Sequence, residues 1–331
     1  MDLSTTYLGM KLPHPMMAGA SPLSDEIDTV RRLEDSGSAA IVLRSLFEEQ
    51  IVREQMADFR YQNGSDDSSA EATSFFPSPE MFVLGPEEYL NHLRQVKEAV
   101  HIPVIASLNG STPGGWLSYA RQLEQAGADA LELNVYHAAI DPEKSGAEIE
   151  RETVEMVREV KRNVKIPVAV KLSPFFASFA HFALQLDREG ADGLVLFNRF
   201  YEADIDVEEL TLTRELHLSD SSELLLRLRG IAALAPRVKG SLAVTGGVHT
   251  ALDVIKSTMA GAHVTQMVSA LLKRGPEYLR RVRREVQEWM EVHEWESLSE
   301  MRGNMGVDKA PNPKAYERGN YMMMLQSWDG A

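Results

Sequence analysis

The stretch PVAVKL, residues 167–172, is an apolar strand that ends in a lysine followed by a leucine. Three other apolar runs also finish in polar or small residues, namely ALELN at 130–134, GLVLFN at 193–198 and SLAVTGG at 241–247. A buried strand disfavours such ends, because an unpaired polar side chain is costly in a core. In a parallel α/β barrel, however, the C-terminal ends of the strands form the rim that carries the chemistry. The pattern therefore predicts a fold and a site together.

A β–α repeat runs along most of the chain. In four places an amphipathic helical segment meets a glycine, which suits the left-handed position just past a helix end, and an apolar strand follows within three residues. These glycines are Gly37, Gly127, Gly190 and Gly261. The predicted strands are 15–20, 39–44, 103–108, 130–134, 167–172, 193–198, 241–246 and 263–268. Strands that are apolar on both faces are typical of parallel sheets covered by helices, so the repeat predicts a (β/α)8 TIM barrel, with a doubly wound sheet as the alternative.

Three stretches fall outside the repeat. Residues 48–100, between the second and third strands, contain the polar run 63–69 and are predicted to be a mobile loop over the site or a disordered surface excursion. Residues 199–221 form a second insertion after the sixth strand. We expect a barrel over residues 1–298 and a C-terminal tail over 299–331 that packs on the barrel or at a subunit interface.

Composition and charge exclude several classes of protein. No run approaches the roughly 18–20 apolar residues of a membrane span, and the N-terminus lacks the pattern of a secretory signal. The chain has no cysteine, so it can hold neither a disulfide nor an iron–sulfur cluster. Its 34 basic and 49 acidic residues give a net charge of −15, which disfavours a nucleic-acid partner. We therefore expect a cytoplasmic protein with a small-molecule substrate and no membrane partner.

Polar residues at the strand ends predict two halves of a ligand site. Thr245-Gly246-Gly247 ends the seventh strand and Ser269 follows the eighth, and the loops after these strands often bind phosphate in this fold. Turn glycines without a ligand are the alternative. Lys171 is expected to face the barrel mouth, where its ammonium can stabilise negative charge on a reduced cofactor or an enolate. A surface lysine at a strand exit is the alternative.

Asparagines add hydrogen-bonding groups to the same rim. Asn134 and Asn198 each offer a donor and an acceptor, which suits a heterocyclic ligand, although turn-forming asparagines are the alternative. Arg44-Ser45 ends the second strand and Asn109 follows the third, so these residues are further candidates for the rim.

One histidine lies close to this rim in the sequence. His137 follows Asn134 by three residues, and a histidine can act as a base near neutral pH because its unperturbed pKa is about 6.5. An ordinary histidine in a surface loop is the alternative. The other histidines show no HExxH or similar spacing, so no metal site is expected.

Taken together, these segments resemble the dihydroorotate dehydrogenase family of FMN-dependent TIM barrels over roughly residues 1–295. HPMMAGAS (14–21) is similar to the first-strand segment whose small residues, here Ala18, Gly19 and Ala20, lie against the flavin. LRSL (43–46) is similar to the second-strand motif, with Arg44 in place of the usual lysine. AVKLSPFF (169–176) resembles the strand-five motif, which implies that Lys171 lies beside the flavin. VTGGV (244–248) and QMVSALL (266–272) resemble the two segments that bind the FMN phosphate.

The substrate side of the resemblance contains departures. LELNVYHAAID (131–141) is similar to the loop that carries the substrate asparagines and the catalytic base, but the base, a Cys or Ser in the family, aligns with His137. Ala138 and Ala139 replace the proline and the second asparagine of that loop, and acidic and leucine-rich sequence around 203–230 replaces a glycine-rich flavin segment. VLFN (195–198) resembles the strand whose asparagine contacts orotate.

The resemblance implies an FMN-dependent oxidoreductase that acts on the CH–CH bond of a dihydropyrimidine such as dihydroorotate, as in pyrimidine biosynthesis. A base would take a proton from C5 while a hydride leaves C6, and Lys171 would stabilise the anionic reduced flavin. Reduction of tRNA dihydrouridine is an alternative that the acidic net charge disfavours. A flavin barrel with another substrate, or one that serves as a non-catalytic electron-transfer subunit, also stays open. So do a homodimer and a separate electron-acceptor protein.

Overall fold

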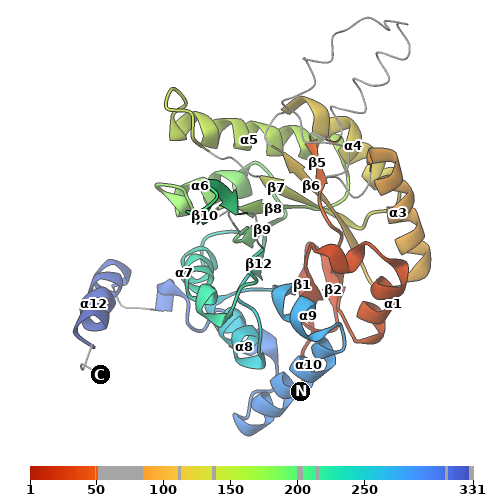
Figure 1. Cartoon of the computed structure of the whole chain (residues 1–331). Helices are drawn as coiled ribbons and strands as arrows, with labels where there is room; N and C mark the ends of the chain where they lie inside the picture. The colour runs from red at the N-terminus through yellow and green to blue at the C-terminus, as the bar shows by residue number, and fades with distance from the viewer. Residues whose placement is uncertain are drawn as a thin grey trace, which may run out of the picture.

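The computed structural model describes residues 1–48, 50, 85–110, 113–135, 139–199, 204–213, 216–309 and 312–327. Its centre is a closed parallel barrel surrounded by helices (Figure 1), which confirms the predicted (β/α)8 architecture. In order around the barrel, the strands are β3 (Met16–Ala18), β4 (Ile41–Val42), β6 (Val104–Gly110), β7 (Ala130–Val135), β8 (Val168–Leu172), β9 (Gly193–Leu196), β12 (Ser241–Thr245) and β13 (Val264–Met267). Pairing of β13 with β3 closes the barrel. The short β5 (Leu46–Phe47) continues the second strand along β6.

Amphipathic helices cover the outside of the barrel. They are α1 (Ile27–Asp35), α3 (Pro86–Ala99), α4 (Pro113–Gln125), α5 (Gly146–Asn163), α6 (Phe179–Arg188), α7 (Leu224–Leu234), α8 (Ala251–Ala260) and α10 (Tyr278–Val292). The short α9 (Ser269–Arg274) lies between β13 and α10. Local sequence sets where these helices begin; in α5, the Ser145 side chain and Glu148 form a capping box.

The prediction that all of residues 48–100 form a loop or a disordered excursion is wrong for residues 85–100. This part is the regular helix α3, which begins at a proline after Gly85 and buries Leu93 and Val96 against the barrel. Its apolar spacing follows a helical period, and the polar sequence before it hid that pattern. Residue 49 and residues 51–84 lie outside the described part of the chain.

The inside of the barrel is a second, smaller core. Each strand contributes one small or aliphatic side chain to it: Met17, Val42, Ile105, Ala130, Ala169, Val195, Ala243 and Val264. A hairpin of β1 (Thr5–Tyr7) and β2 (Met10–Leu12) closes the N-terminal end, and its Tyr7 and Leu12 pack against this core. Because side chains alternate along a strand, residues two positions further on enter the next layer toward the rim. That layer is polar and contains the site.

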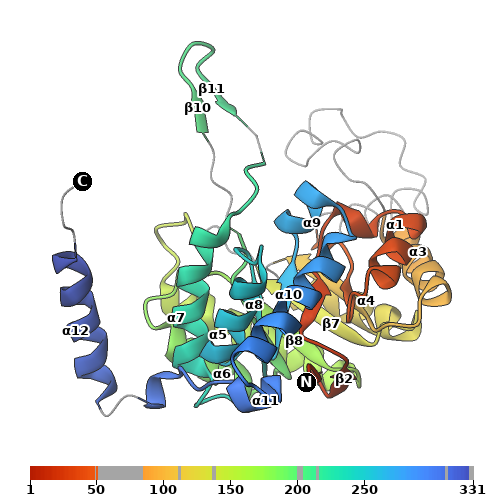
Figure 2. The ribbon, with the colours of Figure 1, turned by 90° about the horizontal axis from the view of Figure 1, so that it is seen from below.

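Two segments extend away from the barrel. A hairpin of β10 (Asp204–Asp206) and β11 (Thr211–Thr213) projects outward in Figure 2. The tail continues through α11 (Leu298–Met301) to α12 (Pro313–Gln326), which lies beside the barrel in Figures 1 and 2. In the described part of the chain, no helix is both long and apolar enough to cross a membrane.

Candidate functional site

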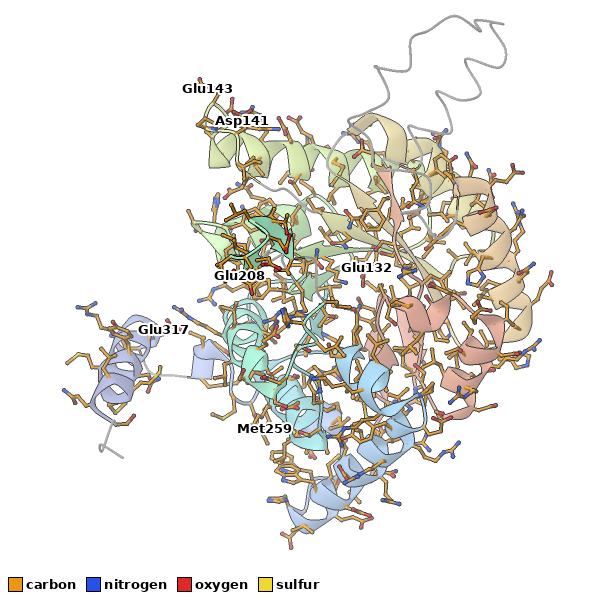
Figure 3. The ribbon with its side chains drawn as sticks, in the orientation of Figure 1. Glu132, Asp141, Glu143, Glu208, Met259 and Glu317 are labelled. Carbon is orange, nitrogen blue, oxygen red and sulfur yellow. The ribbon has the colours of Figure 1, made fainter. Side chains whose placement is uncertain are left out.

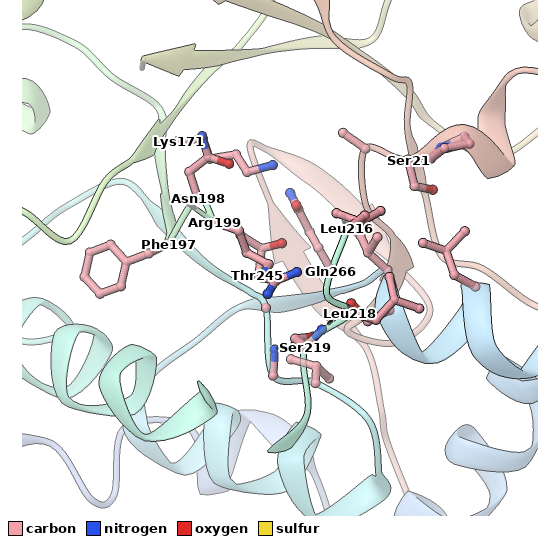
Figure 4. A pocket seen from close by; sticks show the side chains of 18 residues that line it. Ser21, Lys171, Phe197, Asn198, Arg199, Leu216, Leu218, Ser219, Thr245 and Gln266 are labelled. Carbon is pink, nitrogen blue, oxygen red and sulfur yellow. Dashed lines mark hydrogen bonds between the residues drawn. The ribbon is translucent and has the colours of Figure 1, made fainter. Parts of the chain in front are cut away.

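A pocket opens where β8, β9, β12 and β13 end at the C-terminal rim (Figure 4). Seven of the residues predicted from the sequence line it: Ala20, Lys171, Asn198, Thr245, Gly246, Gly247 and Ser269. The strands are parallel, so their C-terminal ends meet at one rim, and residues far apart in sequence come together there.

One end of the pocket is a cradle of backbone N–H groups and hydroxyls. Gly246 and Gly247 have φ angles of 82° and 80°, a left-handed conformation that favours glycine. A Cβ on Gly247 would lie 2.4 Å from the backbone nitrogen of Leu224, so no side chain fits there. Ser269 is the first residue of α9 and faces the same space. Tight glycine turns beside a hydroxyl are well suited to an anionic group.

Ser219, which lies in the insertion after β9, completes this cradle. Its backbone N–H donates to Ser269 Oγ at 3.1 Å, and its own Oγ accepts from the Gly247 N–H at 3.4 Å. The same hydroxyl lies 3.1 Å from Nε2 of His249, and Lys273 Nζ donates to the Ser219 carbonyl at 3.0 Å. Burial, and after it the Lys273 ammonium, lowers the pKa of His249. Sequence reasoning missed Ser219 and His249, because only the folded insertion brings Ser219 to the glycine turn.

The other end of the pocket is built on a buried charge pair. Lys171 Nζ lies 3.3 Å from Oε1 of Glu132, and Gln266 Nε2 donates to the other carboxylate oxygen at 2.6 Å. Glu132 is 1% exposed and lies at the centre of the barrel (Figure 3). Gln266 Oε1 is buried and has no hydrogen-bond partner among the residues that the structure describes. Sequence reasoning missed Glu132 and Gln266, although each is a polar residue inside an apolar strand.

The predicted asparagines lie at the ends of β7 and β9, on either side of β8. Asn198 Nδ2 donates to Asn134 Oδ1 at 2.8 Å, and the Asn198 backbone N–H donates to the Leu172 carbonyl. Strand register places Asn134 beside Lys171 on one side and beside Asn109 on the other. The amides and the ammonium therefore form one polar row along the rim.

The predicted contact of Ala18, Gly19 and Ala20 with the flavin stays a prediction, and only Ala20 of the three lines the pocket. Ala18 is buried. A Cβ on Gly19 would lie 2.8 Å from Val268 Cγ2 and 3.3 Å from Gln266 Oε1. Glycine is therefore needed for β3 to approach the eighth strand closely.

Arg44 and Ser45 are engaged away from the pocket lining. The Arg44 guanidinium forms a 2.7 Å ion pair with Asp25. Burial raises the pKa of Asp25, although the charge of Arg44 acts in the opposite direction. Ser45 Oγ lies 2.8 Å from Ser107 Oγ. Their predicted contact with a cofactor stays a prediction, and His137 lies outside the described residues.

Arg199 is a further lining residue that sequence reasoning missed. It follows Asn198, donates to the His217 carbonyl and lies 3.5 Å from Glu223. Across the described ranges, no group of three or more His, Asp or Glu side chains is arranged to hold a metal ion.

Comparison of the sequence with known proteins places this chain in a family. The family model for dihydroorotate dehydrogenase matches residues 83–290. The chain is 27% identical over 309 residues to the catalytic subunit of dihydroorotate dehydrogenase B (NAD(+)) of Thermoplasma volcanium, which covers 91% of this chain and 98% of that protein. It is 26% identical over 322 residues to the NAD-dependent dihydropyrimidine dehydrogenase subunit PreA of Escherichia coli, which covers 91% and 76%.

The family match covers more than half of the chain and includes six of the strands that form the barrel. It also includes the glycine turn, Lys171 and both asparagines. This chain belongs to the dihydroorotate dehydrogenase family and is a flavin-dependent oxidoreductase of the dehydrogenase type.

Proposed function

We propose that this protein binds FMN and catalyses electron transfer at the CH–CH bond of a dihydropyrimidine such as dihydroorotate. The observation that carries the proposal is a single pocket with an anion cradle at Gly246-Gly247 and Ser269, and a lysine ammonium, Lys171, at its other end. The cradle suits the phosphate tail of FMN, and the Lys171 ammonium suits a flavin ring that becomes negatively charged on reduction.

The residues present fit FMN. Gly246 and Gly247 form a left-handed turn that lines the pocket, and the turn keeps this shape only with glycine, because a Cβ at position 247 would lie 2.4 Å from the Leu224 nitrogen. The buried Gln266 Oε1 has no partner among the described residues and lines the pocket, so it can accept a hydrogen bond from a ligand N–H. Ser219 and Ser269 supply hydroxyls for the phosphate end.

When bound, FMN would supply the two-electron acceptor. Lys171 would stabilise negative charge that develops over the pocket floor, because a fixed ammonium in a site of low polarity acts strongly. Asn134 and Asn198 would orient the substrate through the amide groups that their mutual hydrogen bond leaves free. We assign His137 as the base that removes the C5 proton, on the family alignment of its loop.

Anaerobic titration of the purified protein tests the proposal. The bound flavin is first identified as FMN by chromatography after release from the protein. Dihydroorotate and dihydrouracil are then added separately, with NAD(P)H as a third titrant, and the loss of oxidised-flavin absorbance is followed. We expect a dihydropyrimidine to reduce the flavin. Reduction by NAD(P)H alone would contradict the substrate assignment, and a protein that binds no flavin would contradict the whole proposal.

We also propose that a separate protein supplies the electron acceptor. Two relatives are named as subunits of larger NAD-dependent enzymes, and this chain has no cysteine to hold an iron–sulfur cluster. Steady turnover of the isolated chain with a dye, but not with NAD(+), is the expected result. Direct turnover with NAD(+) would contradict it. Failure of every dihydropyrimidine to reduce the flavin would favour the non-catalytic alternative.

A further inference from the structure

Glu132 lies in the polar layer inside the barrel. It lies two positions beyond Ala130 on β7, and the layer that contains Ala130, on the side away from the rim, consists of small or aliphatic side chains. It is 1% exposed. Removing a carboxylate from water is costly unless it gains partners, so its position calls for a specific explanation.

Both carboxylate oxygens of Glu132 have a partner that faces the pocket. Oε1 lies 3.3 Å from Lys171 Nζ, and Oε2 accepts from Gln266 Nε2 at 2.6 Å. Lys171 and Gln266 line the pocket, whereas Glu132 lies outside its lining. Among the residues that the structure describes, Lys171 and Gln266 therefore connect Glu132 to a ligand on the pocket floor.

Another polar group lies close to Glu132 from the hairpin side. The Tyr7 hydroxyl is fully buried and has no hydrogen-bond partner in the described part of the chain. Burial, and after it the charge of Glu132, raises the pKa of Tyr7 well above its usual value. The phenol is neutral, so the Lys171 ammonium is the counter-charge of Glu132 in this layer.

We propose that Glu132 is a positioning residue that holds Lys171 and Gln266 at the pocket floor and offsets the lysine charge beneath the flavin ring. This inference rests on the proposed FMN function and deepens it. A lone ammonium would stabilise the anionic reduced ring strongly. The Lys171–Glu132 pair, which carries no net charge, stabilises it less, and the reduction potential is correspondingly lower.

Glu132→Gln is the discriminating variant, because it removes the charge and keeps the shape. The amide oxygen of the introduced glutamine can still accept a hydrogen bond from Lys171. Its amide nitrogen can donate to Gln266 Oε1, which has no partner among the described residues, once the Gln266 amide rotates by half a turn. Sulfite, which binds oxidised flavin and leaves negative charge on the ring, serves as the probe. We expect at least tenfold tighter sulfite binding and a potential higher by about 30 mV, the equivalent of tenfold for a two-electron couple.

Two further variants separate charge balance from mere support of the fold. Lys171→Met should weaken sulfite binding at least tenfold, in the opposite direction. The double variant Lys171→Met/Glu132→Gln is again neutral, so its sulfite affinity should return to within about threefold of the wild type, since two neighbouring charges are removed together. Glu155→Gln, on the exposed face of α5, is the matched control and should change neither quantity.

Each outcome decides the matter. Unchanged sulfite affinity in a flavin-loaded Glu132→Gln protein, or shifts of the same sign in both single variants, would overturn the inference and leave the FMN proposal intact. If Glu132→Gln does not fold, the same substitution is measured in the Lys171→Met background, where it should still tighten sulfite binding tenfold. If the wild type binds no FMN, the proposed function fails, and thermal unfolding of the apoprotein then tests the Lys171–Glu132 pair. Each single variant should unfold at a lower temperature than the double variant. A double variant that unfolds at the lowest temperature would overturn the pairing.

Discussion

The Asn198 amide donates a 2.8 Å hydrogen bond to the Asn134 carbonyl oxygen and so joins the ends of two strands across β8. The bond fixes both amides, since it uses one donor of Asn198 and the acceptor of Asn134. The pair is left with both N–H donors of Asn134, the oxygen of Asn198 as an acceptor and the second N–H of Asn198. A cyclic amide of the kind found in a dihydropyrimidine carries the complementary C=O and N–H groups on one edge.

We predict that Asn198→Ala raises the KM for the dihydropyrimidine substrate about tenfold to a hundredfold, because a lost hydrogen bond in a desolvated site costs about 1–3 kcal/mol. The double variant Asn134→Ala/Asn198→Ala should be less impaired than the sum of the single effects, because the two amides act as a unit. Steady-state kinetics at matched FMN content is the measurement. Asn91→Ala, on the exposed face of α3, is the control. An unchanged KM in Asn198→Ala would remove the pair from substrate binding.

The glycine turn gives a second prediction. In Gly247→Ala the new Cβ would lie 2.4 Å from the Leu224 nitrogen, in addition to the strain of a left-handed alanine. We expect FMN affinity to fall at least a hundredfold, as fluorescence titration of the apoprotein would measure. Gly9→Ala is the control, because Gly9 has a φ of 77° but open space around its Cβ position. It should lose about 1 kcal/mol of unfolding free energy and keep its FMN affinity. Equal FMN affinities in the two variants would contradict the cradle.

The barrel could be predicted because its strands are apolar on both faces and punctuated by glycines at helix ends. Gly37, Gly127, Gly190 and Gly261 all have the positive φ angle that this reading requires. The closing hairpin of β1 and β2 could not be predicted in the same way. Its strands are three residues long and pair with each other. The hairpin is joined to the barrel through Thr5, which donates to the His263 carbonyl, and the Leu8 N–H, which donates to Ser241 Oγ, and these groups come together only in the fold.

The site was predictable where strand ends carried the signal, as at Lys171 and Gly246. Glu132 and Gln266 lie inside strands, and a single polar residue in an apolar run has no partner that sequence alone identifies. Here the partners are 39 and 134 positions from Glu132. Ser219 reaches the glycine turn only in the fold, where its N–H bonds to Ser269 Oγ and its Oγ accepts from the Gly247 N–H.

The role of His137 is a third prediction. In His137→Ala we expect kcat to fall at least a hundredfold, within the range by which a positioned base accelerates proton transfer, and FMN content to stay unchanged. Anaerobic stopped-flow measurement of flavin reduction separates this step from binding. His181→Ala is the control, because that histidine is an exposed residue of α6. Full activity in His137→Ala would sink the assignment.

Two buried histidines predict how stability depends on pH. Burial, and after it the charges of Arg283 and Arg302, lowers the pKa of His14 and His263 to about 4. The unfolded chain, with histidine pKa values of about 6.5, binds more protons between these limits, so stability is full above pH 6.5 and falls as the pH drops toward 4, by at most about 3 kcal/mol for each histidine. His263→Asn keeps an acceptor for the Leu242 N–H and does not titrate, so urea unfolding at pH 7 and pH 4.5 should show a smaller loss in this variant. The same loss in variant and wild type would show that protonation of His263 does not cause it.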